Sequence, residues 1–99
     1  MSRPVTLHGD ALAEFDEAYD WFESRWTDSG DKFAAAVRSV FERIGANPKM
    51  HSIVIDNVRR ALVPGHRYYV VYYRERVDDI EVLSIFHTSR DPKEWQERI

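Results

Sequence analysis

The chain has 99 residues, of which 43% are hydrophobic and 13% aromatic, and its formal net charge is −3. This length suits one domain with a modest core, so we interpret residues 1–99 as a single domain. The absence of cysteine excludes disulfides and thiolate metal sites. No apolar stretch approaches the ~20 residues of a membrane span, and no signal peptide is recognisable, so we expect a cytoplasmic protein.

The first expected elements are a short strand and an amphipathic helix. Val5 and Leu7 alternate with polar neighbours, which predicts a strand. Asp10 is the expected N-cap of the helix, in which apolar residues recur at spacings of three and four. This apolar stripe comprises Leu12, Phe15, Ala18, Tyr19, Phe22 and Trp26. The opposite face, which we expect to be solvated, carries Glu14, Asp16, Glu17, Asp20 and Glu23.

A second helix is predicted after the turn-forming residues 27–30. Its apolar face consists of Phe33, Val37, Val40, Phe41 and Ile44. Gly45 is the expected residue just past its end, and Pro48 blocks any continuation. Because each helix has one apolar stripe and the turn between them is short, we expect an antiparallel helical hairpin.

The remaining chain is rich in β-forming residues. Residues 53–55 and 58–63 are interrupted by a bend or bulge at Asp56-Asn57, and runs at 68–73 and 80–86 follow. Their short connections predict an antiparallel meander whose central strand is 68–73, since that run is apolar on both faces. Asp91, Pro92 and Glu94 form a capping-box pattern that opens a short C-terminal helix through Trp95.

The expected fold class is therefore α+β. A short N-terminal strand precedes an α-helical hairpin packed on a three- to four-stranded antiparallel sheet, and a short C-terminal helix ends the domain. The hairpin can cover only one face of the sheet. Either Tyr68/Val70/Tyr72 or Tyr69/Val71/Tyr73 then points to the other face, where only the segment around Trp95 remains as cover.

We expect that cover to be insufficient. It would leave a patch of Tyr and Val flanked by arginines, which is the composition of interaction hot spots. The flanking arginines are Arg59 or Arg60, Arg67, Arg74 and Arg90. The sequence therefore favours a macromolecular partner over the conversion of a small molecule.

Several segments, taken in order, resemble the ParE/RelE toxins of bacterial type II toxin–antitoxin systems, which are often described as plasmid-stabilisation toxins. They are Ala18–Glu23, Asn47-Pro48, Val58–Tyr68, Val71–Arg74 and Ile85–Trp95. The resemblance spans about residues 5–95, and the ending His-x-x-Arg-Asp-Pro-x-x-Trp at 87–95 is closer to the ParE branch. It implies a cytoplasmic toxin in a hetero-oligomer with a cognate ParD-like antitoxin, which wraps a helix and an extended tail around the hairpin and sheet.

The resemblance also implies a target. ParE-like members poison DNA gyrase and have no established catalytic residues, so we favour a protein that is not an enzyme. RelE-like members cut mRNA on the ribosome, and His87, Arg67 and Arg90 are the catalytic candidates for that alternative. His87 is the one histidine near the arginines suited to proton transfer at neutral pH, although a structural role at a turn is favoured for it.

The candidate contact residues fall into two sets. The residues expected to bind the target are Arg59, Arg60, Arg67, Tyr68, Arg90 and Trp95. The residues expected to bind the antitoxin are Phe15, Tyr19, Phe22, Tyr72 and Arg74. Each also has a structural interpretation: the arginines as solvated cations, Trp95 as a side chain packed on the sheet.

Three functions stay open at this point. Gyrase inhibition is favoured by the C-terminal motif and by the net charge of −3, which disfavours binding to the phosphates of RNA. An mRNA endonuclease of the RelE type is the second, and an inactive homologue that only binds its antitoxin is the third. No cofactor and no metal are expected, because the histidines lack ligand spacing and no glycine-rich nucleotide loop is present.

Overall fold

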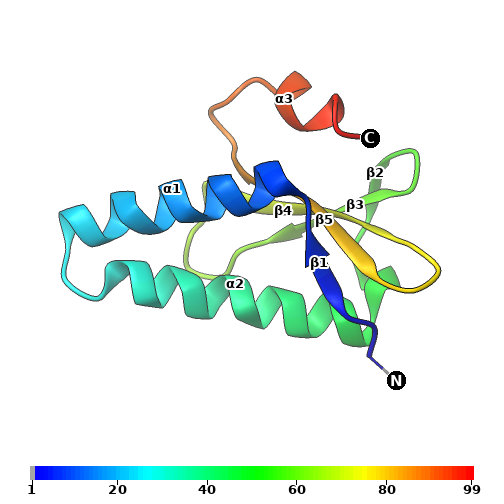
Figure 1. Cartoon of the computed structure of the whole chain (residues 1–99), viewed down its shortest axis with the longest axis horizontal. Coiled ribbons are helices and arrows are strands. Elements are labelled where there is room, and N and C mark those ends of the chain that lie inside the picture. Colours follow the sequence, from blue (N-terminus) through cyan, green and yellow to red (C-terminus); the bar gives the residue numbers. More distant parts are fainter. Residues whose placement is uncertain (1) are drawn as a thin grey trace.

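Five strands form one sheet, with a helical hairpin on one face and a short helix on the other (Figure 1). The computed structural model describes residues 2–99. The elements in chain order are β1 (Val5–Leu7), α1 (Gly9–Arg25), α2 (Ser29–Ala46), the 3-10 helix η1 (Pro48–Met50), β2 (Ile53–Ile55), β3 (Val58–Leu62), β4 (Tyr69–Glu75), β5 (Ile80–His87) and α3 (Lys93–Gln96).

The strand order is β1-β5-β4-β3-β2, so β4 is the central strand, as expected. β1 runs parallel to β5, and the other pairs are antiparallel. The α+β class is confirmed, but the expected three to four strands were too few. Residues 53–55 and 58–62 are separate strands joined by a tight turn, in which Asp56 adopts a positive φ of 50°.

The main core lies between the hairpin and the sheet. Its buried side chains come from α1, α2 and the side of the sheet that faces them; they are Ala11, Ala18, Phe33, Val37, Val40, Ile44, Ala61, Val63, Val71, Tyr73, Ile80, Val82 and Ile85. Phe15 of α1 stacks on Phe33 of α2 with ring centroids 5.8 Å apart. The stripe predicted for α1 is only partly correct, because Leu12 and Trp26 are exposed.

The helix ends differ from the expected caps. The N-cap of α1 is His8, whose Nδ1 accepts a hydrogen bond from the backbone N–H of Asp10 at 3.1 Å, so the assignment of Asp10 as the cap was wrong. Gly45 was expected just past the end of the second helix, but α2 continues to Ala46 and Asn47 is its C-cap. Gly45 therefore lies inside α2, where it is buried. A Cβ on Gly45 would approach the carbonyl oxygen of Arg3 to 3.1 Å, which gives a packing reason for glycine there.

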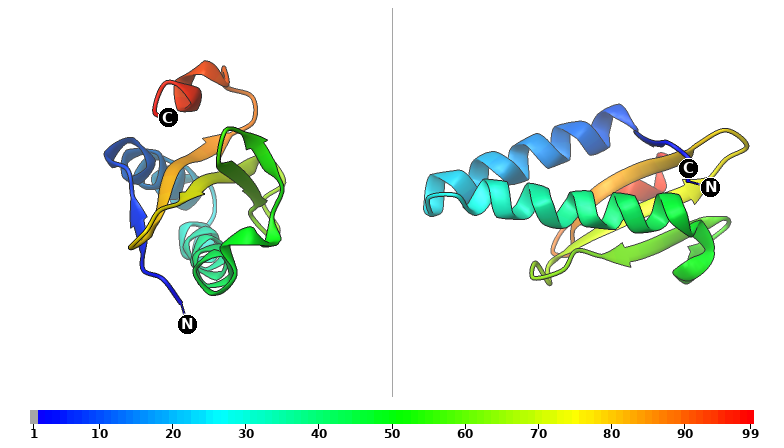
Figure 2. Two further views of the ribbon diagram at one scale, coloured as in Figure 1. Left: turned by 90° about the vertical axis from the view of Figure 1, so that its right-hand side faces the viewer. Right: turned by 90° about the horizontal axis from the view of Figure 1, so that it is seen from below.

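The second face of the sheet is better covered than the sequence suggested. Figure 2 shows α3 on the side of the sheet opposite the hairpin. A second buried cluster lies beneath it, formed by Val58, Val70, Leu83, Phe86 and Trp95. Trp95 is 3% exposed and stacks on Tyr72 with ring centroids 3.8 Å apart. The expectation that the C-terminal segment leaves this face uncovered was therefore only partly right: Trp95 closes the cluster, whereas Leu62, which is paired with Val70 on the same face, is 62% exposed.

Candidate functional site

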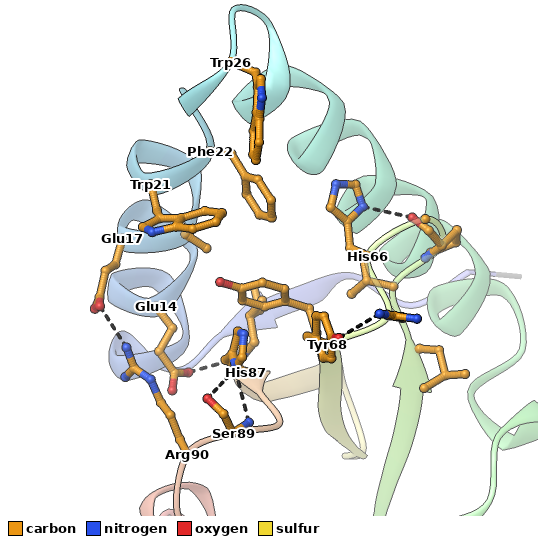
Figure 3. Close-up of a pocket in the computed structure, with 18 residues that line it drawn as sticks. Glu14, Glu17, Trp21, Phe22, Trp26, His66, Tyr68, His87, Ser89 and Arg90 are labelled. Carbon is orange, nitrogen blue, oxygen red and sulfur yellow. Dashed lines mark hydrogen bonds and ion pairs between the residues drawn. The ribbon is translucent and has the colours of Figure 1, made fainter. Parts of the chain in front are cut away.

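A partly open groove of about 1010 Å³ lies between the C-terminal half of α1, the β3–β4 turn and the loop that follows β5 (Figure 3). Trp21 and Phe22 of α1 and Trp26, the C-cap of that helix, line one side of it. Leu62 and Tyr68 enter it from the opposite side. We call this cavity the aromatic groove.

The aromatic groove exposes large apolar side chains. Trp21 is 46% exposed, Trp26 60%, Leu62 62% and Tyr68 52%. Phe22 lies deeper and packs against Phe33 at a centroid distance of 5.1 Å. Exposed aromatic residues grouped in one concave surface are typical of protein interaction sites. Leu62 is paired with Val70, which faces α3, so part of the sheet face that we expected to be exposed does line the groove, beside Trp21 and Trp26 from the hairpin.

Two arginines neutralise the carboxylates that line the aromatic groove. Glu17 accepts a hydrogen bond from Arg90 at 2.8 Å. Glu14 is paired with Arg98, also at 2.8 Å. Arg67 lines the groove too, but it donates to the hydroxyl of Tyr68 at 2.8 Å and packs over that ring. Four charged side chains between residues 2 and 99 line the groove, and Arg67 is the one that forms no ion pair.

His87 is held at the floor of the aromatic groove by the turn that follows β5. Its Nδ1 accepts the backbone N–H of Ser89 at 3.1 Å, and the Ser89 hydroxyl lies 2.7 Å from the same atom. Because a backbone N–H can only donate, neutral His87 carries its proton on Nε2. Its ring stacks on Tyr68 and meets Tyr69 edge-on. The structure therefore gives His87 the turn-forming role that the sequence interpretation favoured.

Tyr69 forms part of the same wall. Burial raises the pKa of its phenol above the ordinary value, so the hydroxyl stays protonated at neutral pH and adds no charge to the groove.

The structure divides the residues expected to contact the target. Arg67, Tyr68 and Arg90 line the aromatic groove, and so does His87, so the three catalytic candidates lie together. Arg59, Arg60 and Trp95 do not. Arg59 donates to the carbonyl oxygen of His51 at 2.6 Å and so fastens the segment before β2. Arg60 is exposed on the other side of β3, and Trp95 of α3 is buried against the sheet.

The residues expected to contact the antitoxin are more dispersed. Phe22 lines the aromatic groove. Phe15 packs inside the hairpin, where the Tyr19 hydroxyl donates to Asp31 at 2.7 Å. Tyr72 lies under Trp95, and Arg74 forms an ion pair with Glu81 at 2.9 Å.

Sequence reasoning missed Trp21, Trp26 as a groove residue, Leu62 and Glu14. Trp21 did carry a usable signal, because a tryptophan among the acidic residues of an amphipathic helix is out of place on a solvated face. Glu14 carried no such signal, because its position in the helical repeat does not distinguish it from the neighbouring acids, which are exposed. The expectation that all five acids of α1 are solvated was wrong for Glu14, which is 10% exposed, and for Glu23, whose carboxylate accepts the N–H of Gly30 at 2.7 Å.

In the described part of the chain, no three His, Cys, Asp or Glu side chains are grouped so as to hold a metal ion. None of the helices between residues 2 and 99 has the length and apolarity to cross a membrane.

Comparison with known proteins identifies the family. A solved structure described as "Chromosomal ParDE TA system from P. aeruginosa" has the same fold, with a TM-score of 0.61 and 16% sequence identity over 87% of this chain and 96% of that chain. A comparison with curated protein sequences gave no match. The model of the family described as "ParE toxin of type II toxin-antitoxin system, parDE" matches residues 5–92, so this chain belongs to the ParE toxin family of type II toxin–antitoxin systems.

Proposed function

We propose that this protein is a toxin that inhibits DNA gyrase by protein–protein contact, and that a cognate antitoxin neutralises it by occupying the aromatic groove. The observation that carries the proposal is the groove itself. It exposes four large apolar side chains, and both of its carboxylates are already paired within the chain. A partner entering it therefore buries aromatic surface without leaving an acid of the toxin unpaired.

Burial is the main source of affinity in this proposal. Fully burying an aromatic side chain stabilises a complex by about 1.5–3 kcal/mol, whereas a solvent-exposed ion pair adds about 0–1 kcal/mol. Trp21, Trp26 and Tyr68 together outweigh the single uncompensated charge of Arg67. We expect Arg67 to set the orientation of the partner, through an acidic residue placed beside it.

Contact is favoured over RNA cleavage by the state of the candidate catalytic groups. Cleavage through the 2′-hydroxyl needs a proton acceptor, a proton donor and cations around the phosphate. Here Nδ1 of His87 is engaged by Ser89, and Arg90 is paired with Glu17. Arg67 alone offers a free positive charge in the groove, on a chain whose net charge is −3.

The target is tested with purified components. The toxin should inhibit supercoiling by purified gyrase in a concentration-dependent way. No inhibition at any ratio of toxin to gyrase contradicts the proposal. Primer extension on mRNA after induction covers the alternative, since new 5′ ends would show a RelE-type endonuclease. Growth arrest on expression without antitoxin excludes the third possibility, an inactive homologue.

Antitoxin binding is tested with the product of the neighbouring reading frame. Trp21→Ala should weaken the complex by about 30-fold or more, as expected for a hot-spot aromatic residue. Leu12→Ala is the matched control, because Leu12 is equally exposed on α1 but does not line the groove. Equal affinities of the two variants would place the antitoxin elsewhere. Moderate salt alone should leave the complex intact, because burial and not charge holds it.

A further inference from the structure

The ion pair between Glu14 of α1 and Arg98 of the C-terminal segment contacts β5 at an irregularity of the β4–β5 pairing. Consecutive residues of β4, Tyr72 and Tyr73, are paired with Ser84 and Val82 of β5, which lie two residues apart. β5 therefore contains one extra residue, a β-bulge. Such a bulge leaves backbone groups without partners in the ladder.

Glu14 and Arg98 bind groups of the extra residue, Leu83, and of the two residues that follow it. Oε1 of Glu14 accepts hydrogen bonds from the backbone N–H of Ile85 at 3.2 Å and from the hydroxyl of Ser84 at 2.9 Å. Arg98 donates to the carbonyl oxygen of Leu83 at 2.9 Å and to Glu14 at 2.8 Å. Both side chains are nearly buried, at 10% and 12% exposed. A carboxylate and a guanidinium thus bind the backbone of β5 at the bulge and directly after it.

The bulge decides which way the end of β5 faces. Val82 lies in the core under the hairpin and Leu83 in the cluster under α3. Regular alternation would put Ile85 on the α3 side and Phe86 under the hairpin. The structure shows the reverse: Ile85 is in the hairpin core and Phe86 in the α3 cluster. The extra residue therefore shifts the phase of the strand by one, which turns every later side chain to the opposite face.

We infer that Glu14 and Arg98 are positioning residues, which keep the bulge in place and thereby aim Ile85 and His87 into the aromatic groove. Both of those residues line the groove on the hairpin side. A continuous strand would direct them toward α3, and the floor of the groove would then lack the His87 ring on which Tyr68 stacks. The role of the pair in partner binding rests on the proposed function; its role in the geometry of β5 does not.

The test uses Glu14→Gln, which keeps the shape of the side chain but removes its charge. Glu75→Gln is the control, because Glu75 also forms an ion pair, with Arg3, which is more exposed and lies away from the groove. Ser84→Ala is a milder variant that removes only the hydroxyl donated to Glu14. For Arg98, Arg98→Lys should stay closer to the original protein than Arg98→Gln, since lysine keeps the charge.

Three measurements separate positioning from general stability. In Glu14→Gln, hydrogen exchange at the Ile85 amide should accelerate by roughly tenfold or more, the factor expected for loss of one charge-assisted hydrogen bond. The NMR signals of the His87 ring should shift, while exchange at the Val71 amide in the same core stays within about a factor of two of its original rate, as expected for a local opening. The control variant should change none of these.

Uniform acceleration of Ile85 and Val71, with an unchanged His87 signal, would overturn the inference, because the pair would then only stabilise the fold. No change at Ile85 would overturn it as well. Affinity for the antitoxin is measured in parallel and should fall with the change at His87. A local change at Ile85 and His87 with undiminished antitoxin affinity would support the positioning role and contradict the assignment of the groove to the antitoxin.

Discussion

The second cluster of the sheet depends on one side chain, and its loss should have a large effect. Trp95 is 3% exposed, stacks on Tyr72 and closes the cluster formed by Val58, Val70, Leu83 and Phe86. Trp95→Ala removes the largest part of that cover and leaves a cavity or exposes the cluster to water. Substitutions of this kind cost about 3–5 kcal/mol, and we expect a value near the lower end because α3 lies at the surface.

This cost is a large fraction of the stability of a small domain, which is about 5–15 kcal/mol. For a domain of this size, each kcal/mol lowers Tm by about 4–8 °C, so Trp95→Ala should lower Tm by roughly 12–25 °C. Thermal denaturation followed by far-UV circular dichroism measures the effect. Trp26→Ala is the control, because Trp26 is 60% exposed and its loss should change stability by no more than about 0.5 kcal/mol.

The indole nitrogen offers a sharper test. Among residues 2–99, one buried polar side-chain atom has no hydrogen-bond partner, and it is Nε1 of Trp95. Trp95→Phe therefore loses area but no hydrogen bond, and it should cost about 1–2 kcal/mol. If Trp95→Ala were no more destabilising than Trp26→Ala, α3 would not cover the sheet in solution and our account of this face would be refuted.

Two further predictions concern single polar contacts. The hydroxyl of Tyr73 donates to the carbonyl oxygen of Pro48 at 2.7 Å, so Tyr73→Phe should cost about 1 kcal/mol in urea denaturation, whereas Tyr68→Phe, at an exposed site, should cost less than half of that. Hydrogen bonds from Arg76 hold the pKa of Asp79 at about 2, below its ordinary value of 3.8. A lowered pKa stabilises the fold above the unfolded value and loses that contribution as pH falls through the folded value. The difference in Tm between the original protein and Asp79→Asn should therefore be constant above pH ~5 and shrink between pH ~4 and ~2; a difference that stayed constant down to pH ~2 would contradict the ion pair.

Local patterns predicted the elements but not what joins them. The helical hairpin and the central strand followed from periodicity, because the stripe of Phe33, Val37 and Ile44 and the doubly apolar run at 68–73 are properties of contiguous residues. The parallel pairing of β1 with β5 joins residues about 75 positions apart, such as Val5 and Ile80, and no local pattern specifies it.

The candidate site was predictable in part for the same reason. Arg67, Tyr68 and Arg90 lie in the groove because they belong to the β3–β4 turn and to the turn after β5, which meet at the same end of the sheet. The burial of Glu14 depends on Arg98, and the bulge in β5 depends on both. Neither the burial of Glu14 nor the bulge can be predicted from the residues next to it in the sequence. We underestimated how much of the second face is covered because α3 has only four residues, whereas the Trp95 indole alone packs against the whole second cluster.

The position of β5 also has a consequence for synthesis of the chain. β5 supplies Ile80, Val82 and Ile85 to one cluster and Leu83 and Phe86 to the other. Neither cluster can close until the ribosome has made residues 80–87, although the helices that need them have been made long before. The nascent toxin thus carries an uncovered helical hairpin while residues 47–87 are made, and its folding waits for a contact of long sequence separation, which slows it.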